Sequence, residues 1–364
     1  MNIIILAEVF TKSGVGKYIY ELSNKLAADN KVWIMSPTND WDLNESENLH
    51  FIKLYRMDKK PSNLYKNVKI LDKVIKENKI DIIHANHRMA AMTAKIRNIF
   101  HKNVPVVWTC HTAPYPTNLI KKILGYHGDK TIAISPEAYD FCSNTLKLNK
   151  NNICVVYNGV DESRLKPLTD IEKSNIYEKY NIDKNKFIIS IHGRIDKVKG
   201  HDVFIKALEE LPQDLLDRIT ILCSGDTTTS YSSEVKSLLE NSSKRIDWIF
   251  TGWIDTRDIL GVSDLLVQPS RREGFPLTCI EAFFMRVPMI RTKTGGYAAM
   301  TDLCVGIDKE DYHRLADEIL DAYQNYDKFN AMISKAYDRA CNEFTLDVMA
   351  NKTYNVYKAA IKEN

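Results

Sequence analysis

Short apolar runs rich in β-branched residues alternate with longer amphipathic segments along most of the 364-residue chain. In the first half these runs are Ile3–Ala7, Lys31–Met35, Ile80–His84, Val104–Trp108 and Thr131–Ile134. The intervening segments repeat apolar residues at helical spacing, as in Gly16–Ala28, Asn63–Lys79 and Arg88–Phe100. Strands that are apolar throughout are buried on both faces, so the alternation predicts an α/β fold with a parallel sheet covered by helices.

The alternation pauses at Tyr157–Asp170, where Asn158-Gly159 is a turn signal and Pro167 breaks regular structure. It then restarts with the runs Phe187–Ile191, Ile219–Cys223, Ile246–Phe250, Asp264–Val267 and Pro288–Arg291. We therefore expect two Rossmann-like, doubly wound domains, covering residues 1–165 and 166–345. Residues 346–364 are expected to form a C-terminal helix that crosses back to the first domain. Ligands of such sheets bind beyond the carboxyl ends of the strands, which places the expected site in a central cleft.

The composition is that of a globular protein, with 44% hydrophobic and 27% charged residues. No apolar run approaches the ~20 residues that span a bilayer. The opening segment, which lacks a basic stretch, is interpreted as a buried strand rather than a signal peptide. Seven cysteines without a C-x-x-C pair indicate reduced thiols and neither a disulfide framework nor a zinc site. A cytoplasmic location is expected.

Charge is unevenly distributed. Residues 1–165 hold 23 Lys/Arg against 16 Asp/Glu, a net of +7, whereas residues 166–364 hold 27 against 31, a net of −4. Within the first half, five lysines recur at steps of three or four and so share one helical face: Lys66, Lys69, Lys73, Lys76 and Lys79. A second segment, Thr117–His127, combines apolar residues with Lys121 and Lys122. Either these are ordinary solvated faces, or they contact an anionic membrane surface.

A glycine-rich segment, Lys12–Lys17, follows the first strand and opens the first helix. Gly14 and Gly16 would let the backbone approach a ligand, and a helix N-terminus favours an anion. The spacing is not that of a P-loop, and Ile19 occupies the place of the third dinucleotide-binding glycine. A plain turn is the alternative.

Two further motifs each follow a predicted strand of the second domain. In His192–Gly200, Arg194 and Lys199 lie where strand turns to helix, which suits a diphosphate; two solvated cations are the alternative. In Gln268–Ala282, Glu273 precedes a helix and Glu281 lies within an apolar turn of it. A carboxylate in such a turn needs a partner or a ligand hydroxyl, and it can accept both hydrogen bonds of a ribose diol.

In order along the chain, these motifs resemble those of the retaining group 1 (family 4) glycosyltransferases of GT-B fold. The ordered set is Gly14-x-Gly16, Asp81–His84, Thr109–His111, Ile134-Ser135, Tyr157–Asp161, Gly193-Arg194 with Lys199-Gly200, Phe250–Gly252, Glu273-x7-Glu281 and Thr294–Gly296. Each motif is weak alone, whereas the ordered set is specific. The resemblance implies a bacterial enzyme of polysaccharide or glycolipid biosynthesis, with acceptor binding in the first domain and donor binding in the second.

For the second domain the resemblance implies that Arg194 and Lys199 hold the donor diphosphate, that Glu281 binds the nucleotide ribose and that Glu273 contacts the donor sugar. Backbone N–H groups along one segment would lie near the sugar hydroxyls and the β-phosphate: Gly274, Phe275, Pro276 and Leu277.

For the first domain it implies that His111 lies beside the reacting sugar, with its backbone carbonyl near the anomeric carbon. A buried structural histidine is the alternative. Gly14 and Gly16 would let this domain close over the diphosphate. The implied catalytic residues are His111, Glu273, Arg194 and Lys199.

Two positions depart from the family pattern. His84-Ala85-Asn86-His87 replaces a frequent His-x-His, so His84 receives little weight. The segment Tyr297–Asp302 is shorter than usual after the paired glycines, which leaves the shape of that side of the donor pocket open.

The expected reaction moves a hexose-type sugar from UDP- or GDP-sugar to a glycan or lipid-linked acceptor, with retention. We recognise no Asp-x-Asp pair or His/Asp/Glu cluster at a strand end, so metal independence is expected, with no cofactor beyond the co-substrate. Peripheral contact with an anionic membrane is a possible partner interaction, and no nucleic acid is expected. The alternatives are a GT-B epimerase, a phosphorylase or a catalytically inactive nucleotide-sugar binder.

Overall fold

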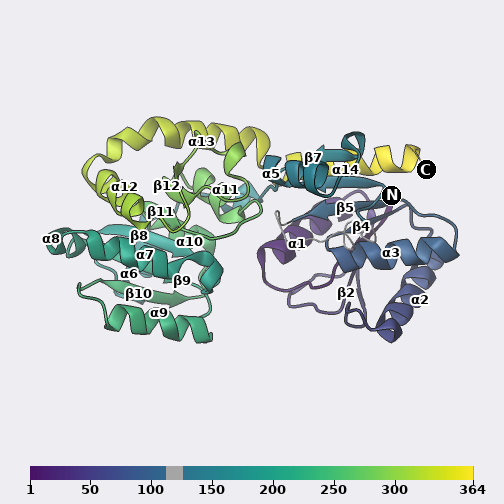
Figure 1. The fold of residues 1–364 in the computed structure, drawn as a ribbon, viewed down its shortest axis with the longest axis horizontal. Coiled ribbons are helices and arrows are strands. Elements are labelled where there is room, and N and C mark those ends of the chain that lie inside the picture. The colour runs from purple at the N-terminus through teal and green to yellow at the C-terminus, as the bar shows by residue number, and fades with distance from the viewer. Residues whose placement is uncertain (112–125, 364) are drawn as a thin grey trace. The chain divides into compact units, whose positions relative to one another are not determined.

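The computed structural model describes residues 1–111 and 126–363. The chain divides into two compact units, Met1–Val160 with Glu343–Asn364, and Asp161–Asn342. Figure 1 traces the chain from purple to yellow.

The first unit holds a parallel sheet with strand order β3-β2-β1-β4-β5-β6-β7. The strands are β1 (Asn2–Leu6), β2 (Lys31–Ser36), β3 (Leu49–Lys53), β4 (Ile82–Ala85), β5 (Val106–Cys110), β6 (Lys130–Ala133) and β7 (Ile153–Val155). Every residue of β4, β5 and β6 is buried, as expected for a sheet covered on both faces. Strand order reverses between β1 and β4, so the switch point of this sheet lies at their carboxyl ends.

The described helices of this unit are α1 (Gly14–Ala27), α2 (Pro61–Asn78), α3 (Arg88–Phe100), α5 (Pro136–Asp140) and α14 (Leu346–Lys362), with short turns η1 (Phe141–Thr145) and η2 (Lys150–Asn152). The C-terminal α14, yellow in Figure 1, packs against α1, β5 and β6. Thr345 caps its first turn by accepting the Val348 N–H at 3.1 Å.

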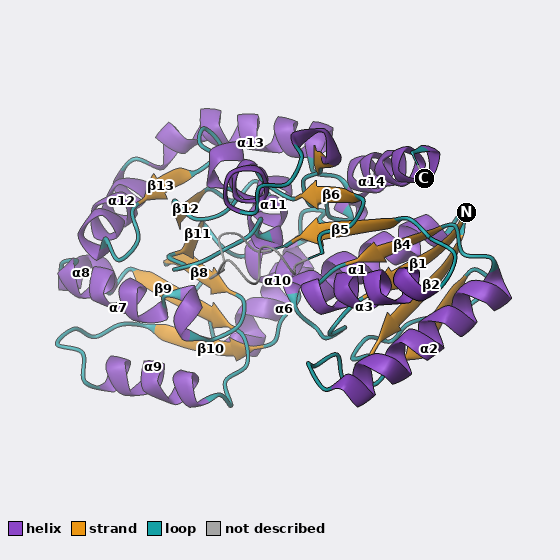
Figure 2. Cartoon of the chain, turned by 45° about the vertical axis from the view of Figure 1, so that its right-hand side comes forward, coloured by secondary structure: helices purple, strands orange, loops and turns teal. Residues whose placement is uncertain are grey.

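The second unit holds a parallel sheet of order β10-β9-β8-β11-β12-β13, seen with its flanking helices in Figure 2. The strands are β8 (Phe187–His192), β9 (Ile219–Ser224), β10 (Trp248–Gly252), β11 (Leu265–Gln268), β12 (Met289–Thr292) and β13 (Val305–Ile307). This order reverses between β8 and β11, so the switch point lies where His192 and Gln268 end their strands. Both sheets confirm the predicted doubly wound α/β class.

The helices of this unit are α6 (Asp170–Tyr180), α7 (His201–Glu210), α8 (Gln213–Leu216), α9 (Ser230–Glu240), α10 (Thr256–Gly261), α11 (Leu277–Phe284), α12 (Tyr312–Gln324) and α13 (Asn330–Glu343). Short turns are η3 (Glu162–Arg164), η4 (Lys197–Lys199), η5 (Tyr297–Ala299) and η6 (Tyr326–Phe329). Throughout the described part of the chain, every helix is too short or too polar to cross a bilayer.

Candidate active site

Lys199 is held by a tight turn at the carboxyl end of β8. The Asp196 carboxylate accepts the backbone N–H groups of Val198 and Lys199 at 3.0 and 3.2 Å, which fixes η4. Gly200 follows with φ of +75°, and a Cβ there would lie 2.1 Å from the Pro269 carbonyl oxygen. Only glycine allows this approach, which brings Lys199 beside the segment that follows β11.

Lys199 and Glu273 form an ion pair, with Nζ 2.8 Å from Oε1. Their side chains are 19% and 10% exposed, so the pair is largely screened from water. Burial alone would raise the pKa of the Glu273 carboxyl. The Lys199 ammonium, the Ser270 hydroxyl and the Arg291 guanidinium outweigh burial and hold that pKa below its usual range, so Glu273 is ionised at neutral pH.

Arg194, the other predicted diphosphate ligand, lies at the same strand end but is 63% exposed. Its guanidinium pairs with Asp196 at 3.1 Å. The preceding Gly193 has φ of +135°, and a Cβ there would lie 3.9 Å from Lys199 Nζ. Both predicted cations therefore border the same short loop, one buried against Glu273 and one facing solvent.

Glu281 lies within α11, where it is buried among residues that are otherwise apolar. The predicted donor-binding backbone, Gly274 to Leu277, leads into this helix, and Pro276 is its N-cap. Proline has no N–H, so of these positions only Gly274, Phe275 and Leu277 can donate a backbone hydrogen bond. This corrects the prediction for Pro276, whose contribution is a fixed φ at the helix entrance.

The loop after β12 lies directly against the Glu273 segment. A Cβ on Gly295 would stand 2.3 Å from the Glu273 carbonyl oxygen, and one on Gly296 would stand 2.9 Å from the Phe275 ring. Gly296 also has φ of +81°. The paired glycines are thus required by close packing between two loops of the candidate site.

Arg271 joins these parts, and the sequence analysis assigned it no role. Its backbone N–H donates to the Val198 carbonyl at 2.7 Å, and its guanidinium donates to both carboxylate oxygens of Asp202 at 2.8 Å and to Glu310. Burial would raise the pKa of Asp202, but hydrogen bonds from Arg271 and Tyr231 lower it to about 2. The signal available in the sequence was an arginine three residues after an apolar strand.

In the first unit, His111 follows β5, and its described neighbours include Asn86, Tyr18 and His87. Its Nε2 lies 2.9 Å from Asn86 Oδ1, and its ring stands edge-on to Tyr18 with centroids 4.7 Å apart. Burial, reinforced by His87 and His84, holds the pKa of His111 well below its usual range. The imidazole is therefore neutral at neutral pH, and because Asn86 Oδ1 accepts, the proton lies on Nε2 and leaves Nδ1 as an acceptor.

His84, which received little weight, is a buried structural histidine. Its ring nitrogens lie 2.6 Å from the hydroxyls of Tyr357 and Thr109. Glu8, which the sequence analysis missed, lies just beyond β1 at the switch point. Its carboxylate accepts the Met89 N–H at 2.6 Å at the start of α3, and burial raises its pKa.

Gly14 and Gly16 differ in their surroundings. A Cβ on Gly16 would lie 1.8 Å from the Thr11 carbonyl oxygen, so the loop itself requires this glycine. A Cβ on Gly14 would meet nothing within 4 Å. Ser13 caps α1 by accepting the Gly16 N–H at 3.2 Å. Of the two glycines, only Gly14 leaves open space for a ligand.

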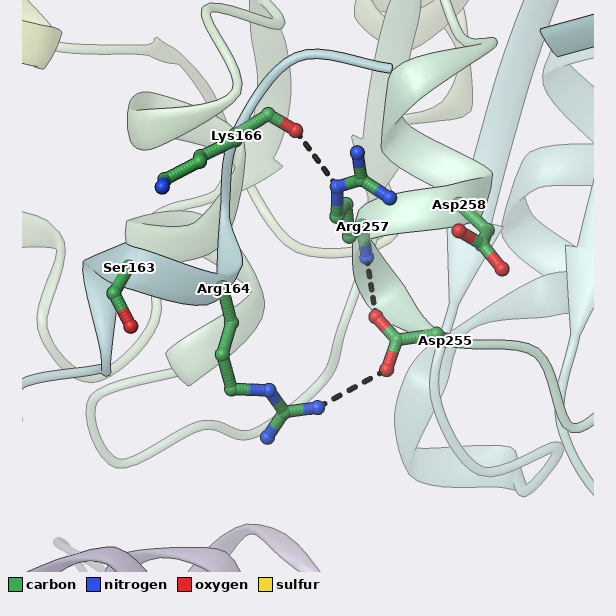
Figure 3. A pocket seen from close by; sticks show the side chains of 6 residues that line it. All are labelled: Ser163, Arg164, Lys166, Asp255, Arg257 and Asp258. Atoms are coloured by element: carbon green, nitrogen blue, oxygen red, sulfur yellow. Dashed lines mark hydrogen bonds and ion pairs between the residues drawn. The ribbon is translucent and has the colours of Figure 1, made fainter. Parts of the chain in front are cut away.

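A pocket of about 480 Å³ lies in the second unit, and Figure 3 shows the side chains that line it: Ser163, Arg164, Lys166, Asp255, Arg257 and Asp258. Arg164 pairs with Asp255 at 3.1 Å and Arg257 with Glu172 at 2.8 Å. None of the predicted donor-binding residues lines it. The pocket therefore lies between the start of this unit and α10, and it is not the candidate active site.

Most of the predicted interfacial segment Thr117–His127 lies outside the described residues, which resume at Tyr126.

The expected absence of an Asp-x-Asp pair is wrong, because Asp40-Trp41-Asp42 is such a triplet, in the loop after β2. Both aspartates are exposed, and no group of three or more His, Cys, Asp or Glu side chains within residues 1–111 and 126–363 is arranged to hold a metal.

Family models match both units. The model for glycosyltransferase family 4 matches residues 12–164, and the model for group 1 glycosyl transferases matches residues 172–339. A Klebsiella pneumoniae uncharacterized 41.2 kDa protein in the cps region is 26% identical over 99% of this chain and all of its own. The Escherichia coli O-antigen biosynthesis glycosyltransferase WclY is 22% identical over 88% of this chain and 93% of its own.

Solved structures share the fold. A glycosyltransferase from Rickettsia africae superposes with a TM-score of 0.88 at 23% identity, covering 100% of this chain and 98% of its own. Anabaena HepE in complex with UDP superposes with a TM-score of 0.84 at 17% identity, covering 99% and 100%. Together with the ordered motifs and the two doubly wound sheets, these matches show that the chain belongs to the group 1 glycosyltransferases and is a transferase of GT-B fold.

Proposed function

We propose that this enzyme transfers a hexose-type sugar from a UDP- or GDP-sugar to a glycan or lipid-linked acceptor, with retention of anomeric configuration. The observation that carries the proposal is the largely buried Lys199–Glu273 pair at the switch point of the second sheet. Glu281 and the entrance of α11 belong to the same end of the sheet.

Charge explains why this pair suits glycosyl transfer. When the bond between the anomeric carbon and the β-phosphate oxygen breaks, negative charge develops on the phosphate and positive character on the sugar. The negative charge on the phosphate is stabilised by Lys199, by Arg194 and by the backbone N–H groups that lead into α11. Once Lys199 has turned to the phosphate, the Glu273 carboxylate accepts hydrogen bonds from hydroxyl groups of the sugar. The Glu281 carboxylate accepts one hydrogen bond from each of the two hydroxyls of the nucleotide ribose.

In the proposed reaction the acceptor oxygen forms its bond to the anomeric carbon on the face from which the phosphate departs. The acceptor proton passes to the leaving β-phosphate oxygen, so no protein carboxylate is needed as a nucleophile. His111 lies beside the reacting sugar with its backbone carbonyl toward the anomeric carbon. Its neutral imidazole adds no positive charge where the sugar becomes cationic.

Relatives support the choice of donor and acceptor class. One Escherichia coli relative, 26% identical over 62% of this chain, is a UDP-Gal:alpha-D-GlcNAc-diphosphoundecaprenol alpha-1,3-galactosyltransferase. Anabaena HepE has been solved with UDP-glucose. We therefore place a UDP-sugar first among the donors and a lipid-linked saccharide first among the acceptors. The working location would be the cytoplasmic face of the membrane, in peripheral contact with it.

A metal-independent reaction is part of the proposal, because two protein cations are available for the diphosphate. Transfer should therefore persist in excess EDTA, with a rate within about twofold of the untreated enzyme. Release of the nucleoside diphosphate is the measurement. Activity that EDTA abolishes and magnesium or manganese restores would show that a divalent ion, and not Lys199 and Arg194, carries the phosphate charge.

The proposal as a whole is tested by a thermal-shift screen of nucleotide sugars, followed by assays with and without acceptor. A binding donor should raise stability by ~2.7 kcal/mol at a hundredfold excess over Kd. Nucleotide release that needs the acceptor, with a retained linkage in the product, is expected. Donor binding without turnover would indicate an inactive binder, and turnover without acceptor would indicate an epimerase. A dependence on inorganic phosphate would indicate a phosphorylase.

A further inference from the structure

Arg291, the third residue of β12, is one of the largest fully buried side chains of the described residues, with an exposure of 0%. A guanidinium is always charged, and burying a charge is costly unless it is compensated. The groups that surround the Arg291 guanidinium should therefore show how its buried charge is compensated.

The guanidinium holds both ends of one loop. Nη2 donates to the Gly295 carbonyl at 2.9 Å and lies 3.2 Å from the Thr294 hydroxyl, while Nη1 lies 3.3 Å from Met300 Sδ. These acceptors begin and end the segment 294–300. No carboxylate of residues 1–111 or 126–363 pairs directly with Arg291, and its Nε–H has no partner there.

The segment that Arg291 holds is the one that packs on Glu273. A Cβ on Gly295 would lie 2.3 Å from the Glu273 carbonyl oxygen and 2.7 Å from that of Gly274. The Gly295 backbone therefore packs directly on the backbone that carries Glu273. If Gly295 moved, this packing would be lost.

The charge of Arg291 also reaches Glu273. Charged groups face that carboxylate from two directions, Lys199 on η4 and Arg291 on β12, and both lower its pKa. On α11, Glu281 and the thiol of Cys279 belong to the same buried cluster, since Arg291, Glu273, Lys199 and Glu281 all act on that thiol. Arg291 and Lys199 therefore lie in the same cluster as Glu273 and Glu281.

We infer that Arg291 is a positioning residue of the donor site, which holds the segment 294–300 against Glu273 and keeps that carboxylate ionised when Lys199 turns to the diphosphate. This inference rests on the proposed function, because it assigns Lys199 to the phosphate and Glu273 to the sugar. Once Lys199 has turned, Arg291 is the cation that remains fixed behind Glu273.

The test compares Arg291→Met with Arg291→Lys. For Arg291→Met we expect kcat to fall about 30-fold, which is ~2 kcal/mol of transition-state stabilisation. The affinity for bare UDP or GDP, whichever the wild type binds in calorimetry, should stay within about twofold. The acid limb of the kcat–pH profile should move up by about one pH unit, because a carboxylate without its cation binds a proton more readily.

Arg291→Lys keeps the charge but loses the fork that reaches Gly295 and Met300. We expect kcat to fall about tenfold with the acid limb unmoved. Thr294→Val removes one guanidinium acceptor and should lower kcat two- to fivefold, again without moving the limb. The matched control is Lys293→Met, which removes an exposed cation that pairs with Asp308 at the same strand end and should change neither quantity.

An acid limb and kcat unchanged in Arg291→Met would overturn the inference, as would a loss of bare-nucleotide affinity equal to the loss of kcat. If Arg291→Met does not fold, Arg291→Lys tests the inference instead. A wild-type kcat in Arg291→Lys, or a shifted acid limb of its kcat–pH profile, would contradict the assignment. A wild type that binds no nucleoside diphosphate or nucleotide sugar would instead contradict the proposed function, whatever the variants do.

Discussion

Glu273 and Glu281 are both buried carboxylates of one motif, yet their surroundings differ. Glu273 pairs with Lys199 at a loop, whereas Glu281 lies within α11, whose other buried residues are apolar. Their separation of eight residues says nothing about this difference. A division of labour follows, with Glu273 directed to the reacting sugar and Glu281 to the nucleotide.

This division predicts opposite kinetic signatures for Glu281→Gln and Glu273→Gln. The first should weaken bare nucleoside diphosphate binding about tenfold, since one charge-assisted hydrogen bond to ribose is lost. The second should lower kcat with the full donor about 100-fold and leave bare-nucleotide affinity equal or tighter, since Lys199 loses its carboxylate. Calorimetry and steady-state kinetics measure both. Equal losses of nucleotide affinity in the two variants would refute the division.

The pH dependence of turnover separates the roles of Glu273 and His111. A lowered pKa keeps Glu273 ionised until pH falls below the usual carboxyl range, and a strongly lowered pKa keeps His111 neutral. We therefore expect kcat to stay level between about pH 5.5 and 7.5, with a loss on acidification only. A limb centred near the usual histidine pKa that disappears in His111→Asn would show that the imidazole titrates during turnover.

At the scale of elements, the helices α1 and α7 both begin where close packing demands a glycine. The entrance to α1 requires Gly16 but not Gly14, and the entrance to α7 requires Gly200. Arg271 supports the η4 turn through the Lys197 carbonyl at 2.6 Å and the backbone of Val198. In the second unit, the candidate site is thus built on turns that are anchored to the end of the sheet.

Gly16→Ala and Gly14→Ala form a matched pair in the first turn of α1. The first places a methyl group within 1.8 Å of the Thr11 carbonyl oxygen and should destabilise the protein by about 2 kcal/mol. The second enters open space and should leave stability within about 0.5 kcal/mol. Urea denaturation gives both values. If Gly14 borders the donor, Gly14→Ala raises donor KM at unchanged stability; an unchanged KM removes it from the site.

At the scale of the whole molecule, the excess positive charge of residues 1–165 has a structural counterpart on α2. Four of the five lysines predicted to share a face lie on α2 and are exposed, namely Lys66, Lys69, Lys73 and Lys76, while Leu71, Val74 and Ile75 are buried on the opposite side. The fifth, Lys79, is exposed but is the C-cap of the helix, with a left-handed backbone. Lys66 and Lys69 lie over the exposed rings of Tyr55 and Tyr65. Tyrosines interspersed with lysines suit a membrane–water interface as well as plain solvent.

We predict salt-sensitive binding of the enzyme to anionic liposomes. Each lysine near such a surface contributes ~1 kcal/mol, and molar salt screens it. Co-sedimentation should occur at low salt, vanish near molar salt and be lost when Lys66, Lys69, Lys73 and Lys76 are changed to Glu. Donor binding by that variant should be normal.

The matched control reverses four exposed lysines of the second unit, namely Lys179, Lys184, Lys236 and Lys309. It changes the net charge by the same amount and should retain most of the liposome binding. Equal losses in both variants would show that net charge alone matters. No binding by the wild type at low salt would indicate that the lysines of α2 are a solvated face.

The sequence alone determined the architecture, because hydrophobic periodicity is a local property that survives without knowledge of partners. The apolar runs at Ile3–Ala7, Val104–Trp108 and Ile219–Cys223 all became buried strands, β1, β5 and β9. Edge strands were harder: β3 was not predicted, since most of its residues are only half-buried and its pattern is weak. The order of the motifs along the chain can also be read without knowledge of spatial contacts, and it identified the family.

Only the tertiary structure decided which residues meet. Lys199 and Glu273 are 74 positions apart, and their contact depends on β8 and β11 being neighbours at the switch point. Arg291 ends the predicted strand run Pro288–Arg291, and nothing local shows which groups meet its charge. The loop that follows β12 turns back over it and offers the Gly295 carbonyl, the Thr294 hydroxyl and Met300 Sδ. Strand adjacency and loop return are products of the whole packed sheet, so no local pattern encodes them.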